Sequence, residues 1–341
     1  MFPLLFGLTS WLVVTLPLTL ILQPFVSLSA LGVATISIAA VFPYGALLWR
    51  AMQAPHPRLR NLLVQGLTLG HASAGGLLIS APLALTAVAA WRPVAAVVLA
   101  LAIGVFGVVA ATQPRLRFLR FDAPQLTSAV RLVQLTDVHL GSRGPSVLTH
   151  AMKIALAQKP DAIVITGDLV DGGEVGRAEL APLAASPVPI YMVIGNHERY
   201  VNLETLLVDI DAQGVTVLRD AQLDLGKLQL LGIDDSDTPH YLKSVLPDLT
   251  VREDAFSVLL YHKPDDWEAA RNAGVDLMLS GHTHAGQVWP FSHLVTRRHP
   301  EWRGLYERAG RHLYVSPGTG CWGPIYRIGS WAEVTVIDLA P

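Results

Sequence analysis

Residues 131–139 read RLVQLTDVH, a short apolar run that ends in an aspartate and a histidine two positions apart. A continuous apolar run of this length is typical of a strand that is buried on both faces of its sheet. Because side chains alternate along a strand, Asp137 and His139 are expected to point to the same side where the strand ends. The stretch therefore predicts a buried strand that delivers a carboxylate and an imidazole to one place.

The same arrangement recurs four times further along the chain: residues 162–171 (AIVITGDLVD), 190–198 (IYMVIGNHE), 256–263 (FSVLLYHK) and 275–284 (VDLMLSGHTH). In open α/β sheets, ligands gather beyond the carboxyl ends of the strands. Carboxylates, imidazoles and an amide suit Mn, Fe, Zn or Mg. The sequence thus predicts a metal site built from Asp137, His139, Asp168, Asn196, His262, His282 and His284.

Each motif taken alone has an ordinary structural interpretation. A single Asp-x-His or His-x-His is common in proteins without metal, and Gly-Asn-His occurs in ordinary turns. Five such motifs in this order, each directly after an apolar run, are not expected by chance. A central carboxylate such as Asp168 is able to bridge two cations about 3.5–4 Å apart, which together clamp a phosphoryl group.

The segments between these runs indicate helices. Residues 147–157 and 203–212 carry apolar side chains at helical spacing, and residues 227–233, 313–315 and 333–338 are further strand candidates. Strands first alternate with helices and later dominate. This order predicts α/β layers around a central sheet or sandwich.

The charges after the first 121 residues are predominantly acidic, since that part of the chain contains 18 of the 25 basic residues and all 27 acidic residues. Nucleic acid is not an expected partner, because phosphate backbones select basic surfaces. Cys321 is the only cysteine, which excludes an intramolecular disulfide and a cysteine-based zinc site.

The five motifs, DVH, GDLVD, GNHE, the histidine of YHKP and GHTH, resemble those of the calcineurin-like metallophosphoesterase superfamily, and the end of the chain resembles its bacterial membrane-associated branch. The resemblance covers about residues 132–339. It implies a four-layer α/β/β/α sandwich with the site at the strand ends. Cys321–Trp322 stands where the branch is expected to have small or polar residues.

The resemblance also implies roles for single residues. One metal would be held by Asp137, His139 and His284, a second by Asn196, His262 and His282, with Asp168 between them. His197 would stabilise the transition state or protonate the leaving oxygen. Asp171 and Glu198 would support these groups by hydrogen bonds. Arg327 is a candidate for binding substrate phosphate, with a surface ion pair as its alternative.

The first 121 residues contain no Asp, Glu or Lys, and their only charged side chains are seven arginines. A bilayer core of about 30 Å requires roughly 20 apolar residues per helix. The uncharged runs predict four transmembrane helices near residues 4–22, 30–49, 67–90 and 94–112. A cleaved signal peptide would need a basic start, and a soluble helix would show a polar face. The expected parts are a transmembrane region (1–114), a juxtamembrane linker (115–130) and a catalytic domain (131–341).

The arginines predict an orientation in the membrane. Six of the seven lie on one side of a four-helix arrangement, which by the positive-inside rule is the cytoplasm. The expected location is therefore the inner membrane, with several spans, contacts to membrane lipid and the catalytic domain facing the cytoplasm.

The expected function is hydrolysis of a phosphodiester, phosphomonoester or pyrophosphate bond by a metal-bridging hydroxide that attacks phosphorus in line. Manganese is among the expected metals, and the substrate is expected to be a phosphorylated small molecule or an amphiphilic, lipid-linked one. Two alternatives are a non-catalytic membrane scaffold with the same fold, and a transporter or channel that the domain regulates. The absence of acidic residues from the predicted helices weakens the transporter alternative.

Overall fold

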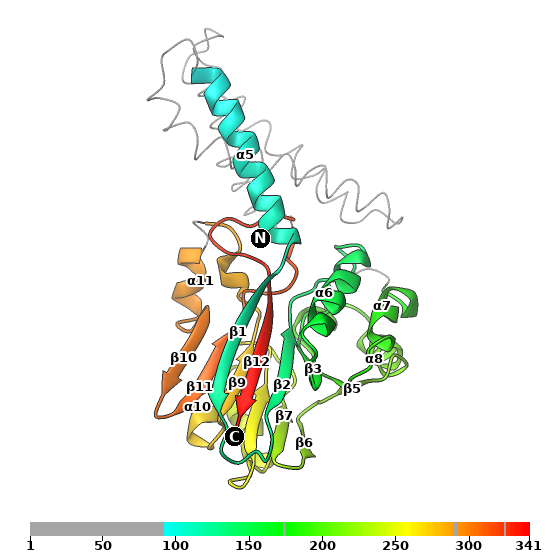
Figure 1. Ribbon diagram of the computed structural model, residues 1–341, viewed down its shortest axis with the longest axis vertical. Helices are drawn as coiled ribbons and strands as arrows, with labels where there is room; N and C mark the ends of the chain where they lie inside the picture. The colour runs from blue at the N-terminus through cyan, green and yellow to red at the C-terminus, as the bar shows by residue number, and fades with distance from the viewer. Residues whose placement is uncertain (1–91, 173–174, 290–291, 324) are drawn as a thin grey trace. The chain divides into compact units, whose positions relative to one another are not determined.

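The computed structural model describes residues 92–172, 175–289, 292–323 and 325–341 (Figure 1). The chain divides into two compact units: residues 1–111 with 323–326, and residues 112–322 with 327–341. The three helices predicted near residues 4–22, 30–49 and 67–90 lie outside the described residues.

The described part of the first unit is mainly the helix α5 (Arg92–Thr112), which covers the fourth predicted span. Several of its large apolar side chains are exposed: Val98, Leu101, Val105, Phe106 and Val109. Among the residues that the structure describes, none of the helices combines the length and apolar character that a membrane crossing requires. The bundle of about four transmembrane helices stays a prediction.

The second unit contains two six-stranded sheets. The first has the order β1 (Arg115–Asp122), β12 (Glu333–Ala340), β2 (Val130–Leu135), β3 (Ala162–Thr166), β4 (Ile190–Val193) and β5 (Val215–Val217). The second has the order β10 (Gly304–Arg308), β11 (Arg311–Val315), β9 (Leu277–Ser280), β8 (Phe256–Leu260), β7 (Leu228–Gly232) and β6 (Ala221–Leu225). Strands β2 to β5 run parallel to one another, as do β7, β8, β9 and β11.

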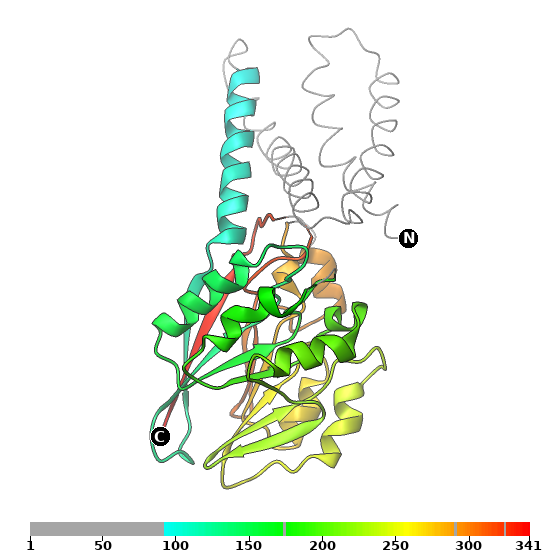
Figure 2. The same ribbon diagram turned by 90° about the vertical axis from the view of Figure 1, so that its right-hand side faces the viewer.

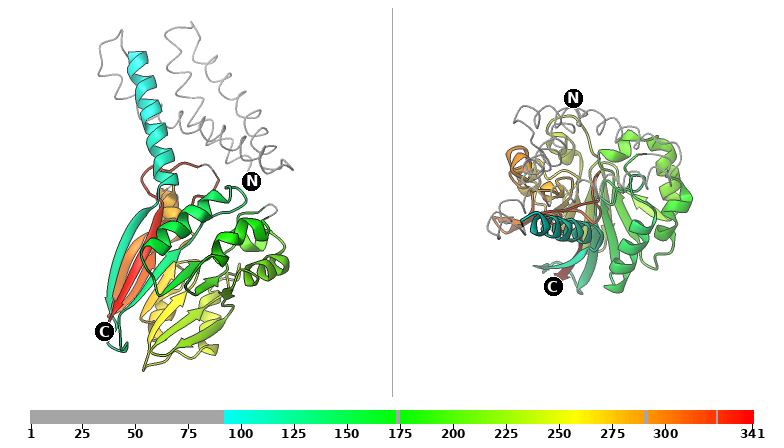
Figure 3. Two further views of the ribbon diagram at one scale, coloured as in Figure 1. Left: turned by 45° about the vertical axis from the view of Figure 1, so that its right-hand side comes forward. Right: turned by 90° about the horizontal axis from the view of Figure 1, so that it is seen from above.

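Three apolar clusters hold four layers together. One packs α6 (Ser146–Ala157), α7 (Arg177–Ala184) and α8 (Leu203–Asp211) onto the first sheet. The second lies between the two sheets, and the third packs α9 (Tyr241–Val245) and α10 (Trp267–Asn272) onto the second sheet. Figure 2 shows α6, α7 and α8 together on the outer side of the first sheet, and Figure 3 shows the sheets from two further directions. The layers follow in the order helix, sheet, sheet, helix.

Part of the expected juxtamembrane linker over residues 115–130 is a strand. β1 pairs in parallel with β12 over eight residue pairs, from Arg115–Glu333 to Asp122–Ala340. Leu119 and Phe121 are buried and the rest of the strand is exposed, as expected for an edge strand with one covered face. The domain that was expected to begin at residue 131 therefore includes this strand. Its partner is more than 200 residues away, so no local pattern reveals the pairing.

One polar side chain crosses the buried space between the sheets. Gln134 of β2 is 1% exposed, and its amide donates to Thr166 Oγ1 at 2.8 Å and to the Ser280 carbonyl of β9 at 3.1 Å. The bond to Ser280 links the carboxyl ends of β2 and β9, which belong to different sheets. This contact holds the two rows of strand ends together where the predicted ligands follow.

Candidate metal centre

The loops that follow the strands carry unusual backbone geometry. Five of the seven predicted ligands have φ in the left-handed region: Asp137 (53°), His139 (57°), Asp168 (53°), His282 (68°) and His284 (50°). This conformation costs a non-glycine residue on the order of 1 kcal/mol or more and persists only where the surrounding structure enforces it. Such residues concentrate at functional sites, so the geometry marks this edge of the sheets as one.

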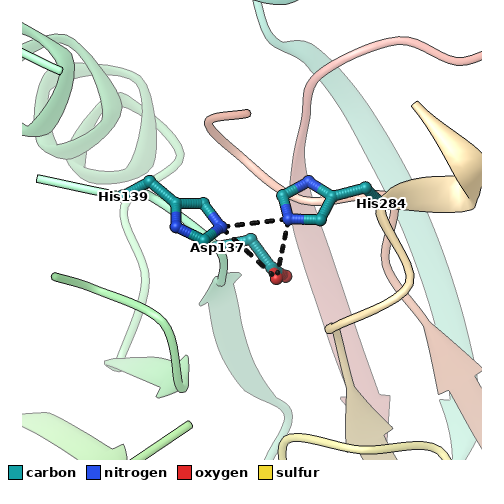
Figure 4. Close-up of side chains that lie close together, drawn as sticks. All are labelled: Asp137, His139 and His284. Atoms are coloured by element: carbon teal, nitrogen blue, oxygen red, sulfur yellow. Dashed lines mark hydrogen bonds and ion pairs between the residues drawn. The ribbon is translucent and has the colours of Figure 1, made fainter. Parts of the chain in front are cut away.

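The first group of converging side chains consists of Asp137, His139 and His284 (Figure 4). The Nε2 atoms of His139 and His284 lie 3.0 Å apart, and His284 Nε2 lies 3.4 Å from Asp137 Oδ1. All three residues are at most 8% exposed. Two imidazole nitrogens and a carboxylate oxygen that face one another in a buried space form a donor set suited to a divalent cation.

The second group consists of Asp168, His262 and His282. His262 Nε2 lies 3.1 Å from Asp168 Oδ2 and 3.2 Å from His282 Nδ1. The other ring nitrogen of His262 meets the Thr166 carbonyl at 2.8 Å, which fixes the ring and leaves Nε2 directed at the site.

Asp168 lies between the two groups. Its Oδ2 is 3.1 Å from His262 Nε2 and 4.0 Å from His139 Nε2. Its Oδ1 accepts a hydrogen bond from the backbone N–H of His197 at 2.9 Å. A carboxylate anchored through one oxygen, with the other oxygen shared between two sets of imidazoles, is placed to bridge two cations.

Asn196 supplies the clearest single test of whether the site fits a metal. Its Nδ2 donates to the Tyr200 hydroxyl at 3.1 Å, and its Oδ1 is buried with no hydrogen-bond partner. A buried carbonyl oxygen without a partner costs about 1–3 kcal/mol. A cation bound to Oδ1 would remove that cost, so this residue fits its predicted role as a ligand.

Glu198 holds the two central loops in place. It is 0% exposed and accepts three backbone hydrogen bonds, from Asp168 at 3.0 Å, Val170 at 2.9 Å and Gly195 at 2.7 Å. A Cβ atom on Gly195 would collide with the Asp168 carboxylate, so only glycine allows the loops to approach this closely.

Asp171 supports the site from the other side. Its carboxylate forms an ion pair with His197 Nδ1, lies 3.5 Å from His139 Nδ1 and accepts from Ser142 Oγ at 2.7 Å. The Nε2 atom of His197 is then directed towards Asp168 Oδ2, 3.9 Å away. Asp171 and Glu198 therefore both hold groups of the centre by hydrogen bonds or ion pairs, and their roles in catalysis stay predictions.

The charges at the site shift the pKa values of two central groups. Burial alone would raise the pKa of Asp168, but the imidazoles around it, chiefly His262, hold that pKa well below its usual range. Burial alone would lower the pKa of His197, but the ion pair with Asp171 and the charge of Asp168 raise it above the ordinary histidine value. His197 is therefore protonated over a wider pH range than a free histidine.

The prediction that Arg327 binds substrate phosphate is not supported by its surroundings. The side chain is 0% exposed, and its guanidinium donates to the carbonyls of Pro317 and Gly320, each at 2.7 Å, and of His284 at 3.1 Å. These bonds hold the loop after β11 against His284. Arg327 therefore lies buried among the loops of the centre and stabilises them from within.

Sequence reasoning did not single out several residues that lie beside the centre. His299 is 8% exposed, contacts the His282 ring edge-on at 5.4 Å and is held by Asp265 Oδ1 at 2.9 Å from its Nδ1. Asp235 is 0% exposed, follows β7 and lies 2.9 Å from Lys263 Nζ. The position of Asp235 directly after an apolar run was a usable signal, whereas nothing local marks His299.

Comparisons with known proteins point to the same family as the sequence motifs. The profile of the calcineurin-like phosphoesterase family matches residues 130–286. An uncharacterized metallophosphoesterase of Helicobacter pylori is 32% identical over 240 residues, covering 67% of this chain and 65% of that protein's length. A Danio rerio protein named transmembrane protein with metallophosphoesterase domain is 31% identical over 340 residues, covering 92% of this chain and 72% of that protein.

Among solved structures, the Plasmodium protein described as the anchor in the inner membrane complex has a TM-score of 0.41 and 15% identity, covering 63% of this chain and 82% of its own. A likeness of that size supports no functional argument.

Proposed function

This chain belongs to the calcineurin-like phosphoesterase family, and we propose that it is a two-metal hydrolase of phosphate esters or pyrophosphates. The observation that carries the proposal is the position of Asp168, whose second oxygen, Oδ2, lies between two sets of buried imidazoles. Ligands from five separate loops converge around it, which a purely structural role does not require.

The residues divide into two ligand sets. Asp137, His139 and His284 would hold one divalent ion, and Asn196, His262 and His282 would hold the other, with Asp168 shared by both. When bound, the ions lower the pKa of a coordinated water towards about 7 and neutralise charge that develops on the phosphoryl oxygens. His282 and His284 are suited to binding metal. Burial lowers the pKa of both far below the usual value, and the neighbouring imidazole of His262 (for His282) or His139 (for His284) lowers it further. Each side chain therefore favours the neutral form that binds metal.

His197 would assist departure of the leaving group. Hydrolysis places the water oxygen on phosphorus, breaks the bond from phosphorus to the leaving oxygen and requires a proton on that oxygen. Burial lowers the pKa of His197, but the contact of its Nδ1 with Asp171 and the charge of Asp168 together raise that pKa above the ordinary histidine value, so the form that carries such a proton is favoured. Its Nε2 atom faces the centre, which is the geometry that a proton donor needs.

The test of this function is metal content and turnover of the full chain, purified in detergent. We expect about two equivalents of divalent metal per chain and hydrolysis of at least one of three substrate classes: diester, monoester or lipid pyrophosphate. A chelator should abolish turnover, and added Mn²⁺ should restore it. If the metal-loaded chain turns over none of the three classes, the scaffold alternative takes the place of this function.

We also propose that the chain is anchored in the inner membrane with the metal centre on the cytoplasmic side, where an amphiphilic substrate would reach it. Support comes from the uncharged stretches among residues 1–114, the exposed apolar side chains of α5 and the name of the Danio rerio relative. We expect the chain in the membrane fraction after an alkaline carbonate wash, released only by detergent. Release by carbonate alone would refute the anchoring.

A further inference from the structure

Two aromatic side chains flank His197. The Tyr200 ring meets the imidazole edge-on at 4.9 Å and 63°, and the Trp322 ring does so at 6.4 Å and 69°. Tyr200 is 68% exposed and Trp322 is 42% exposed, while the His197 side chain is only 12% exposed. The proton donor is therefore framed by two large rings that are themselves open to solvent.

The backbone holds Trp322 in this position independently of its side chain. Its N–H donates to Gln287 Oε1 at 3.0 Å, and its carbonyl accepts from Gln287 Nε2 at 2.9 Å. The preceding Cys321 is 0% exposed, and its Sγ accepts from Arg143 at 3.2 Å. A residue whose backbone is tied on both sides presents its ring to His197 without relying on burial of that ring.

Tyr200 is linked to the same centre by its hydroxyl. That group accepts the Asn196 amide, which leaves Asn196 Oδ1 directed at the proposed metal. The hydroxyl therefore orients the proposed ligand Asn196, whereas the exposed face of the ring does not contact Asn196 in this way. Large aromatic surfaces exposed beside a polar site are typical of binding surfaces for apolar groups.

We propose that Tyr200 and Trp322 bind the apolar part of the leaving group, so that the chain prefers phosphate esters whose departing alcohol carries an aryl or alkyl portion. The inference rests on the proposed function and adds the class of substrate. The leaving oxygen must come to His197 to receive its proton, so whatever is attached to that oxygen lies against the two rings. Burying their exposed faces removes apolar surface from water, which favours such a substrate.

The test compares Trp322→Ala with wild type on three esters of one phosphate: phenyl, decyl and 2-hydroxyethyl. For each ester, the ratio of variant to wild type cancels the intrinsic reactivity of the leaving group. We expect KM for the phenyl and decyl esters to rise about tenfold, which is the usual effect of losing one apolar contact in a substrate site. The kcat values should stay within about twofold, since His197 and its carboxylates are untouched, and the 2-hydroxyethyl ester should show no change.

Three further variants separate the explanations. Trp322→Phe should restore most of the lost affinity, because a ring remains. Tyr200→Phe keeps the ring and removes only the bond to Asn196, so it should lower metal affinity and leave the ester preference intact. Trp289→Ala is the matched control: it is a tryptophan 53% exposed in the loop before α11 (Ser292–Arg298), and it should leave the KM of all three esters unchanged.

If KM of Trp322→Ala rises for the phenyl ester alone, the rings bind an aryl group in the natural substrate. If KM rises for the decyl ester alone, they bind an alkyl chain. If KM rises equally for all three esters, or rises for none of them, the inference is overturned while the proposed function stands. If the wild-type chain hydrolyses no ester and binds no metal, the proposed function fails first and this inference falls with it.

Discussion

Replacing Asp168 by asparagine is expected to lower kcat by about 10³-fold or more and to reduce bound metal from about two equivalents to about one or less. Metal ions contribute several kcal/mol of transition-state stabilisation, and each 1.36 kcal/mol is a factor of ten in rate. Asparagine keeps an oxygen that is able to accept the His197 backbone N–H, so the loop should retain its shape. What it removes is the negative charge and the second oxygen that lies between His139 and His262.

Metal analysis of the purified variant and turnover on its preferred substrate are the measurements. Asp237→Asn is the matched control, because that side chain is fully exposed and lies outside the centre. Near-wild-type turnover of Asp168→Asn would refute the bridging role, and with it the present assignment of the two ligand sets.

Replacing His197 by alanine is expected to lower kcat by about 10²–10⁴-fold while the metal content stays near two equivalents. The His197 side chain lies next to the metal ligands but belongs to neither of the two proposed ligand sets. Asp171 holds its Nδ1, which orients His197 for its proposed role as the proton donor. The loss should depend on the substrate. An alkyl leaving group needs a proton far more than p-nitrophenolate does, so the rate should fall much further for alkyl esters.

The control for this variant is His240→Ala, whose side chain is 75% exposed and pairs with Asp266 away from the centre. If His197→Ala loses one equivalent of metal, His197 is a ligand, which is a geometric possibility because it lies close to His139 and Asp168. If kcat of His197→Ala falls by the same factor for alkyl and p-nitrophenyl esters, His197 stabilises the transition state by its charge and does not protonate the leaving group.

Several features of this protein are readable from its sequence because their causes are local. Strands β2, β3, β4, β8 and β9 appear as largely apolar runs, since burial on both faces favours apolar side chains at most positions. The candidate ligands appear directly after those runs, because the carboxyl ends of parallel strands meet at one edge. Asp137 and His139 followed from this rule alone, and the structure brings them together with His284.

Other features have causes that no local pattern contains. Residues 115–122 were expected to be part of a linker, but they form the edge strand β1 because they pair in parallel with the distant strand β12. Arg327 was a candidate for binding substrate phosphate, with a surface ion pair as the alternative, yet it is buried and donates to carbonyls of the loop after β11 and to the His284 carbonyl. Trp322 stands out in the sequence only as a departure from the expected small or polar residue, and nothing local marks His299; only the folding of their loops places one beside His197 and the other beside His282.

The sequence by itself thus determined which groups bear the chemistry and which strand each one follows, because burial and alternation act over a few neighbouring residues. Only the tertiary structure decided how the ligands divide around Asp168, what supports them and which rings face the proton donor. Those relations depend on how the two sheets and their loops pack. The buried Gln134 bond joins the two sheets, and the close contact at Gly195 joins the loops after β3 and β4.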